Sequence, residues 1–339
     1  MPENISDPKL TAIQGVWSGE SVPTTEASPQ VTVTALTLEK SLTPTFEENN
    51  YDKIGDFDLS SLKVDVLPSG FPIFDKHFVL KKGKAQLVTI AAYTSHGKSA
   101  MMMQIAAYVS QMGPVFVHSF EMEKAELETR LLAAVAHMSS EDIMEGKVPA
   151  RKLALARDEY SKRHLYISKD PNNNMIFVQS NVYEQAKKQG RPALVVVDYL
   201  QIMDGPIDRV QRSREISDLM KGLKSLAIKL QCPVLLGCQM NRECERRGKM
   251  IELKKGVGEY RPILSDLAEG SSIAHDSDVV LFVTRQEQYD GTRKGKADIL
   301  CAKNRGGRVF EAEFNWDGAT CSFEERGHEK GISKVDFSL

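Results

Sequence analysis

The sequence predicts an α/β protein with a doubly wound, mostly parallel sheet. Short apolar runs, often rich in β-branched residues, alternate with longer amphipathic stretches from about residue 61 onward. Such runs are typical of parallel strands that are buried on both faces. They occupy residues 85–93, 113–121, 164–169, 192–200 and 232–239. A turn of the phosphate-binding type follows the first run, which is the usual place of a P-loop in such a sheet.

The stretches between the runs carry apolar residues at helical spacing, as in residues 99–112, 123–138 and 214–231. The C-terminal part adds further apolar stretches, which predict strands that close one edge of the sheet. These stretches are residues 278–289, 296–306 and 308–325.

Residues 1–60 differ from the rest in composition, because serine, threonine, proline and acidic residues replace large apolar side chains and no period is sustained. Ten carboxylates and three lysines give this segment a net charge of −7 in a chain of −2, so the remainder carries +5. We expect residues 1–60 to form a disordered or linker-like acidic tail, residues 61–327 the folded domain, and residues 328–339 a C-terminal tail.

Charge and cysteine content narrow the class of protein only a little. A net charge of −2 gives no global basic signature, so contact with nucleic acid would depend on local patches. Cys232, Cys238 and Cys244 lack the C-x-x-C spacing of a zinc site or redox pair, which predicts reduced thiols. Neither a signal-peptide pattern nor an apolar run of about 18 residues occurs. We therefore expect a cytoplasmic protein without membrane contact.

Residues 92–99, Ala-Tyr-Thr-Ser-His-Gly-Lys-Ser, fit the P-loop pattern with alanine at the usual first glycine. Backbone N–H groups of the loop and of the next helix would surround phosphates, and Lys98 would reach the β- and γ-oxygens. The Ser99 hydroxyl would bind Mg²⁺. The alternative is a plain turn between a strand and a helix. The predicted nucleotide-binding residues of this loop are Ala92, Ser95, His96, Gly97, Lys98 and Ser99.

Three other predicted strands end in groups that suit phosphoryl chemistry. Asp198 could support the metal, although a strand-end aspartate also caps turns. Glu121 could polarise the water that attacks the γ-phosphate. Gln239 could sense the γ-phosphate, although alone it would be an ordinary surface glutamine. Four such strand ends together predict an ATPase.

Several stretches carry more than a generic P-loop pattern. VDYLQIM (197–203) keeps Tyr199, Leu200 and Gln201 after its aspartate, and SLAIKL (225–230) is followed by Q-x-N-R (239–242). In these motifs the chain resembles the C-terminal motor domain of DnaB-type replicative helicases, which are RecA-like ATPases. Further stretches that carry the resemblance are GFPIFDKHF (70–78), AAYTSHGKS (91–99), FVHSFEM (116–122), RPILSDLAEGSSIAHDSDVVLFVTR (261–285) and ADILCAKNRGG (297–307).

The resemblance covers about residues 65–325 and implies ATP and Mg²⁺ as cofactors. It implies that Lys98 and Ser99 bind ATP and Mg²⁺ and that Asp198 supports the metal. Glu121 becomes the catalytic base, and Gln239 couples hydrolysis to motion. The implied function is an ATP-dependent DNA helicase or translocase that acts on single-stranded DNA in replication.

The same resemblance implies a ring of subunits, with a hexamer as the family expectation. Lys303 and Arg305 in AKNRGG are one residue apart on a predicted strand, so they share a face and could reach a γ-phosphate held by the neighbouring subunit. The alternative is two basic residues on a solvated edge strand.

DNA contacts are expected in two segments. The first, residues 205–214, contains Arg209, Arg212 and Arg214, which would otherwise lie in a solvated loop.

The second segment, residues 265–273, is the equivalent of the family's second DNA loop and contains Glu269 and Gly270. It departs from the family because Ala268 stands where an arginine is usual and Ser271 where a glycine is usual. These departures remove one phosphate contact and one site of close backbone approach per subunit.

The family's helical, primase-binding N-terminal domain is expected to be absent, with the acidic tail in its place. Partnership with primase is therefore not carried over, and a helicase loader or primase is left to be tested. Two other functions stay open: a recombinase-like or signalling ATPase ring, and a non-enzymatic replication scaffold that binds nucleotide.

Overall fold

The computed structural model of the chain describes most of the residues beyond position 64. The described ranges are residues 65–77, 79–198, 200–203, 209–241, 261–268, 271–291 and 293–330. The expectations for residues 1–60, for Tyr199, and for Glu269 and Gly270 lie outside these ranges.

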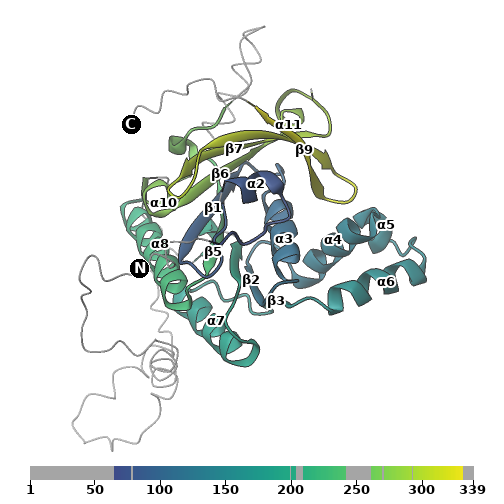
Figure 1. Cartoon of the computed structure of the whole chain (residues 1–339), viewed down its shortest axis with the longest axis horizontal. Helices are drawn as coiled ribbons and strands as arrows, with labels where there is room; N and C mark the ends of the chain where they lie inside the picture. Colours follow the sequence, from purple (N-terminus) through teal and green to yellow (C-terminus); the bar gives the residue numbers. More distant parts are fainter. Residues whose placement is uncertain are drawn as a thin grey trace, which may run out of the picture. The chain divides into compact units, whose positions relative to one another are not determined.

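A nine-stranded sheet with the order β3-β2-β4-β5-β1-β6-β7-β8-β9 organises the described part of the chain (Figure 1). Strands β3 to β6 in this order pair in parallel, and β7, β8 and β9 extend the sheet by antiparallel pairing. The parallel strands are β1 (Gln86–Ala92), β2 (Val115–Ser119), β3 (Leu165–Ile167), β4 (Leu194–Asp198), β5 (Pro233–Gln239) and β6 (Val279–Thr284). The antiparallel strands are β7 (Lys296–Asn304), β8 (Phe310–Asp317) and β9 (Ser322–Lys330). The predicted mostly parallel α/β sheet is confirmed.

Helices cover both faces of this sheet, which explains why successive residues in the middle of its parallel strands are mostly apolar. In β4, Val196 packs into the core layer of α2, α3 and α4, whereas Val195 and Val197 face α7, α8 and α10. Helices α4, α5 and α6 lie together beyond the β3 edge (Figure 1). The α-helices are α2 (Pro72–Lys76), α3 (Lys98–Val109), α4 (Lys124–Ala136), α5 (Ser140–Met144), α6 (Ala150–Ser161), α7 (Met175–Gln189), α8 (Arg209–Leu230), α10 (Ser271–Asp276) and α11 (Glu287–Asp290). The described residues also include the 3₁₀ helices η2 (Leu200–Ile202) and η3 (Leu264–Asp266).

Some element boundaries differ from the sequence prediction. The stretch 278–289 is a strand only to Thr284, and the short helix α11 follows. Residues 308–325 form the hairpin β8–β9 with a turn over residues 318–321, and β9 continues to Lys330, past the expected domain end at residue 327. The cause is that apolar pattern alone does not locate a tight turn inside a long strand-like stretch.

Helix α8 begins at Arg209, five positions before the predicted start. Arg209, Arg212 and Arg214 therefore lie on the first turns of a helix and not in a loop. No helix in the part of the chain that the structure describes has the length and apolar character needed to cross a membrane.

Candidate functional site

The sequence-predicted strand ends meet at one edge of the sheet. In the parallel register, Ala92 at the end of β1 pairs with Gln239 at the end of β5. Ser119 at the end of β2 pairs with Asp198 at the end of β4, and Glu121 follows two residues later. The structure thus gathers the P-loop, both predicted carboxylates and the glutamine at the carboxyl edge, where open α/β sheets bind ligands.

The turn from Tyr93 to Gly97 joins β1 to α3 and has the backbone shape of an anion-binding loop. Ser95 has φ 66° and Gly97 has φ 94°, both in the left-handed region. A Cβ atom on Gly97 would lie 2.6 Å from Cζ of Phe323, so only glycine fits there. Because α3 starts at Lys98, the free N–H groups of its first turn face the same loop.

Lys98 is a buried cation between two carboxylates. Its Nζ contacts Oδ1 of Asp198 and lies 3.7 Å from Oε2 of Glu121. Only 4% of the Asp198 side chain is exposed, against 41% for Glu121. A buried carboxylate needs such a partner, whereas Glu121 keeps access to solvent and to small molecules at the sheet edge.

Sequence reasoning missed Arg285, which directly follows β6 and binds the P-loop from the side. Its backbone N–H donates to Nδ1 of buried His96 at 3.0 Å, and its Nη1 donates to the Ser95 oxygen at 2.9 Å. The guanidinium also lies 4.5 Å from the centre of the Trp316 ring. A signal for Arg285 was present, because an arginine ends the apolar run VVLFVTR as an aspartate ends ALVVVD.

Glu287 holds the other side of the Arg285 guanidinium. Its Oε1 accepts a bond from Nε of Arg285 at 2.9 Å, and its Oε2 accepts one from the Gly295 N–H at 2.8 Å. Burial opposes ionisation, but these bonds hold the pKa of Glu287 below its ordinary value. A charged Glu287 therefore holds the Arg285 guanidinium in contact with the P-loop.

The side chains of Lys303 and Arg305 converge, but not on one strand as predicted, because β7 ends at Asn304 and Arg305 lies in the following turn. Nζ of Lys303 and Nη2 of Arg305 both donate to the His275 oxygen, at 3.0 and 2.8 Å. Burial, and next the charge of Arg305, lower the pKa of Lys303. Strand β7 lies between β6 and β8, so the alternative of an edge strand is wrong.

Lys303 and Arg305 lie near the amino-terminal ends of β1 and β6, whereas the P-loop follows the carboxyl-terminal end of β1. Asn304 pairs with Val279, which in turn pairs with Val88, four residues before Ala92. At the rise of a β-strand, four residues span about 13 Å. Lys303 and Arg305 therefore cannot reach phosphates bound by the P-loop of the same chain.

The predicted DNA-binding arginines differ in their surroundings. Arg212 donates to the main-chain oxygens of Gln201 and Met203 at 2.9 and 3.1 Å, so it ties the start of α8 to η2. Arg214 is exposed on α8.

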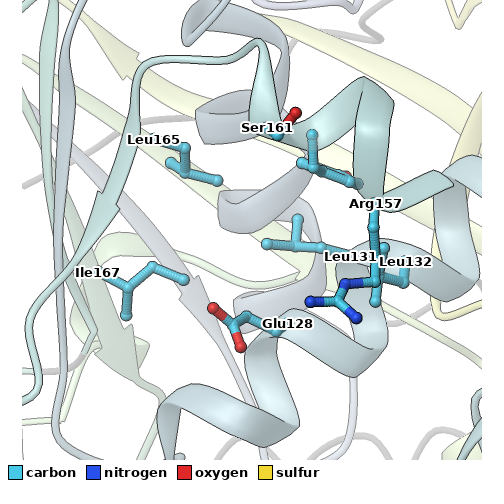
Figure 2. Close-up of a pocket in the computed structure, with 8 residues that line it drawn as sticks. Glu128, Leu131, Leu132, Arg157, Ser161, Leu165 and Ile167 are labelled. Atoms are coloured by element: carbon cyan, nitrogen blue, oxygen red, sulfur yellow. The ribbon is translucent and has the colours of Figure 1, made fainter. Parts of the chain in front are cut away.

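A cavity of about 260 Å³ lies away from these residues, between α4, α6 and β3 (Figure 2). Leu131, Leu165 and Ile167 line it together with Glu128 and Arg157. None of the sequence-predicted site residues lines this cavity, so the strand edge and not the cavity is the candidate site.

The described residues contain no group of three or more histidines, cysteines, aspartates or glutamates that could hold a metal by themselves. Mg²⁺ prefers oxygen ligands and usually binds one or two protein groups together with phosphates. The Ser99 hydroxyl and the Asp198 carboxylate supply oxygens of this kind beside the loop. The residues present therefore fit a magnesium nucleotide better than a metal bound by protein alone.

The chain is similar to the replicative DNA helicase DnaB of Leifsonia xyli subsp. xyli, with 31% identity over 268 residues that cover 76% of this chain and 56% of that protein. It is similar to the probable plasmid replicative DNA helicase of Chlamydia psittaci, with 29% identity, 77% of this chain and 56% of that protein. The chain thus spans just over half the length of the curated relatives it matches.

Two solved structures share the fold. One, described as an ATPase domain, aligns with a TM-score of 0.69 at 23% identity over 88% of this chain and 99% of that chain. A DnaB-like replicative helicase, solved in a study of its interactions with primase, aligns with a TM-score of 0.70 at 23% identity over 86% of this chain and 75% of that chain. The family described as DnaB-like helicase C-terminal domain matches residues 66–325. The chain therefore belongs to the DnaB-like helicase C-terminal domain family.

Proposed function

We propose that this chain is an ATP-hydrolysing motor of a replicative DNA helicase or translocase, acting on single-stranded DNA as a ring of subunits. The observation that carries the proposal is the position of Lys98 beside Asp198 and Glu121 at the strand edge that holds the P-loop. A cation, a buried carboxylate and an accessible carboxylate beside a helix N-terminus are what phosphoryl transfer from a nucleotide requires.

ATP would bind with its phosphates against the loop. Backbone groups of Ser95, His96 and Gly97 would contact phosphate oxygens, and Ala92 ends the strand that leads into the loop. Ser99 and Asp198 would hold Mg²⁺, which neutralises phosphate charge when it is bound. Lys98 would move from its carboxylate partners to phosphate oxygens, because both are anionic.

Glu121 would act as the base for hydrolysis. Glu121 is the more exposed of the two carboxylates, and the Lys98 ammonium group contacts both Glu121 and the buried Asp198. A water beside Glu121 would lose its proton to that carboxylate as its oxygen bonds to the γ-phosphorus, while the bond from that phosphorus to the β,γ-bridging oxygen breaks and ADP leaves with the bonding electrons.

Lys303 and Arg305 would complete the site of a neighbouring subunit. Their place away from the P-loop of their own chain supports this role, because a head-to-tail contact can bring two different parts of the same chain together across an interface. A cation supplied in this way is worth roughly 10³–10⁵ in rate in other NTPases. A hexamer is the ring size that we propose.

Single-stranded DNA would bind through Arg209, Arg212 and Arg214 at the start of α8 and through Glu269 and Gly270. Arg214 is the member whose side chain the structure describes as exposed. Arg212 would contribute through the position of the segment, because its guanidinium is bound to main-chain oxygens. A helicase loader or a primase would be a further partner.

The steady-state ATPase rate with and without single-stranded DNA tests the proposal. Lys98→Ala should abolish hydrolysis, whereas Lys124→Ala, which removes a more exposed lysine paired with Glu128 at 2.8 Å, should not. Glu121→Gln should lower kcat by about 10²–10⁴ while nucleotide still binds. Hydrolysis that DNA leaves unchanged would favour a signalling ring, and no hydrolysis under any condition would favour a scaffold.

A further inference from the structure

The side chain of Gln201 joins two segments that are distant in sequence. It belongs to η2, directly after the β4 strand that ends in Asp198. Its Oε1 accepts a hydrogen bond from the Gln239 N–H at 3.1 Å. Its Nε2 lies 3.1 Å from Sγ of Cys238 and 3.5 Å from the oxygen of Ala268. One carboxamide therefore contacts the end of β5 and the chain that leads to positions 269 and 270.

The two segments are also bound to each other. The Ala268 N–H donates to the Gln239 oxygen at 3.0 Å, and Met240 forms an antiparallel bridge with Leu267. The Asn241 N–H donates to the Asp266 oxygen at 2.8 Å. Residues 239–241 and 266–268 are therefore joined by backbone hydrogen bonds.

Gln201 is linked to the start of α8 as well. Its main-chain oxygen accepts a bond from Nη2 of Arg212 at 2.9 Å. Gln201 thus contacts Gln239 at the end of β5, Ala268, and Arg212 of α8.

A carboxamide suits this place because it presents an acceptor and a donor at the same time. Glutamate at neutral pH accepts only, so its second oxygen would face the Ala268 oxygen. Leucine has a similar shape but makes neither bond, which would leave the polar groups around it without this partner.

We propose that Gln201 is a positioning residue that couples the nucleotide state sensed at Gln239 to the affinity for single-stranded DNA. The inference rests on the proposed function, since it requires a chain that binds both ATP and DNA. Gln201 touches neither ligand, and it acts by holding Gln239, Ala268 and Arg212 in one hydrogen-bonded unit.

The test measures the dissociation constant of labelled single-stranded DNA by fluorescence anisotropy, with a non-hydrolysable ATP analogue and with ADP. The ratio of the two constants reports the coupling between the sites. We expect a wild-type ratio of at least about fivefold. In Gln201→Leu and Gln201→Glu the ratio should fall to within about twofold of one, with the DNA-free ATPase rate close to that of wild type and the thermal midpoint lowered no further than in the matched control.

Gln179→Leu is the matched control. Its Nε2 donates to the Gly222 oxygen at 3.0 Å, so the change removes a comparable side-chain bond between α7 and α8. This control should keep the wild-type ratio. A general loss of packing would lower the ratio in all three variants and would overturn the proposal.

Failure of the inference is distinguishable from failure of the proposed function. A wild-type protein whose hydrolysis and DNA affinity are independent of each other contradicts the motor itself. A wild-type protein that couples them, with the ratio retained in either Gln201 variant, contradicts the role of Gln201 alone. If Gln201→Leu does not fold, the similarly sized Gln201→Glu decides the question.

Discussion

Nη1 of Arg285 lies 2.9 Å from the main-chain oxygen of Ser95, although 190 positions separate the two residues. The same arginine donates its backbone N–H to His96, so the P-loop is bound from the end of β6 as well as by its own strand and helix. Three connections give the loop a defined shape before it meets a phosphate. Because the loop is already ordered, it loses less conformational entropy when a phosphate binds.

Arg285→Lys should therefore weaken ATP binding. Lysine has a single ammonium group and cannot contact Ser95, Glu287 and the Trp316 ring together. We expect KM for ATP to rise about fivefold to tenfold, the equivalent of about 1 kcal/mol or one ordinary hydrogen bond, with a smaller change in kcat. Arg130→Lys, in an exposed pair with Glu126, is the control. An unchanged KM would show that the loop keeps its shape without Arg285.

The Glu287 carboxylate predicts a pH dependence of stability. Its folded-state pKa is lowered, so it contributes stability above its ordinary value of 4.5 and loses that contribution as the pH falls through the folded value. Glu287→Gln should be less stable than wild type in urea at about pH 7, and the difference should shrink at about pH 3. The exposed Glu123→Gln is the control. A difference that does not depend on pH would assign the loss to packing and not to charge.

Gly97→Ala should disrupt the loop by a clash. Its Cβ would meet Phe323 at 2.6 Å, whereas Gly146, which also has a positive φ, has no atom within 4 Å of its Cβ position. Gly97 has φ 94° and Gly146 has φ 69°, so alanine adds backbone strain at both positions, and only Gly97→Ala adds the contact with Phe323. We expect Gly97→Ala to lose about 1–3 kcal/mol more unfolding free energy than Gly146→Ala, by thermal or urea denaturation. Equal losses would mean that Phe323 moves aside without cost.

Mixing two inactive variants tests whether Lys303 and Arg305 act on a neighbour. Lys98→Ala keeps an intact basic pair, and Arg305→Ala keeps an intact P-loop. In rings assembled at random from equal amounts, about a quarter of the interfaces would combine both intact parts and recover hydrolysis. Lys98→Ala mixed with the double variant should recover none. If the first mixture also stays inactive, the basic pair does not serve a neighbouring site.

The sequence by itself determined the class of fold and most of the residues of the candidate nucleotide site. Apolar runs of strand length and amphipathic stretches of helix length are local signals, so β1 to β5, α3 and α4 were predictable within a few residues. The P-loop and the polar residues Glu121, Asp198 and Gln239 were also predictable, because each follows a recognisable strand and parallel strands end at one edge.

Only the tertiary structure decided which basic side chains are exposed and which groups the others contact. The sequence does not distinguish Arg212 and Arg285 from the exposed Arg214. In the structure, Arg212 binds η2 and Arg285 binds the P-loop. The placement of Lys303 and Arg305 away from their own P-loop likewise follows from the register of β1, β6 and β7. The physical reason is that hydrogen bonds between distant segments depend on how the sheet is assembled, and no local period in the sequence records that assembly.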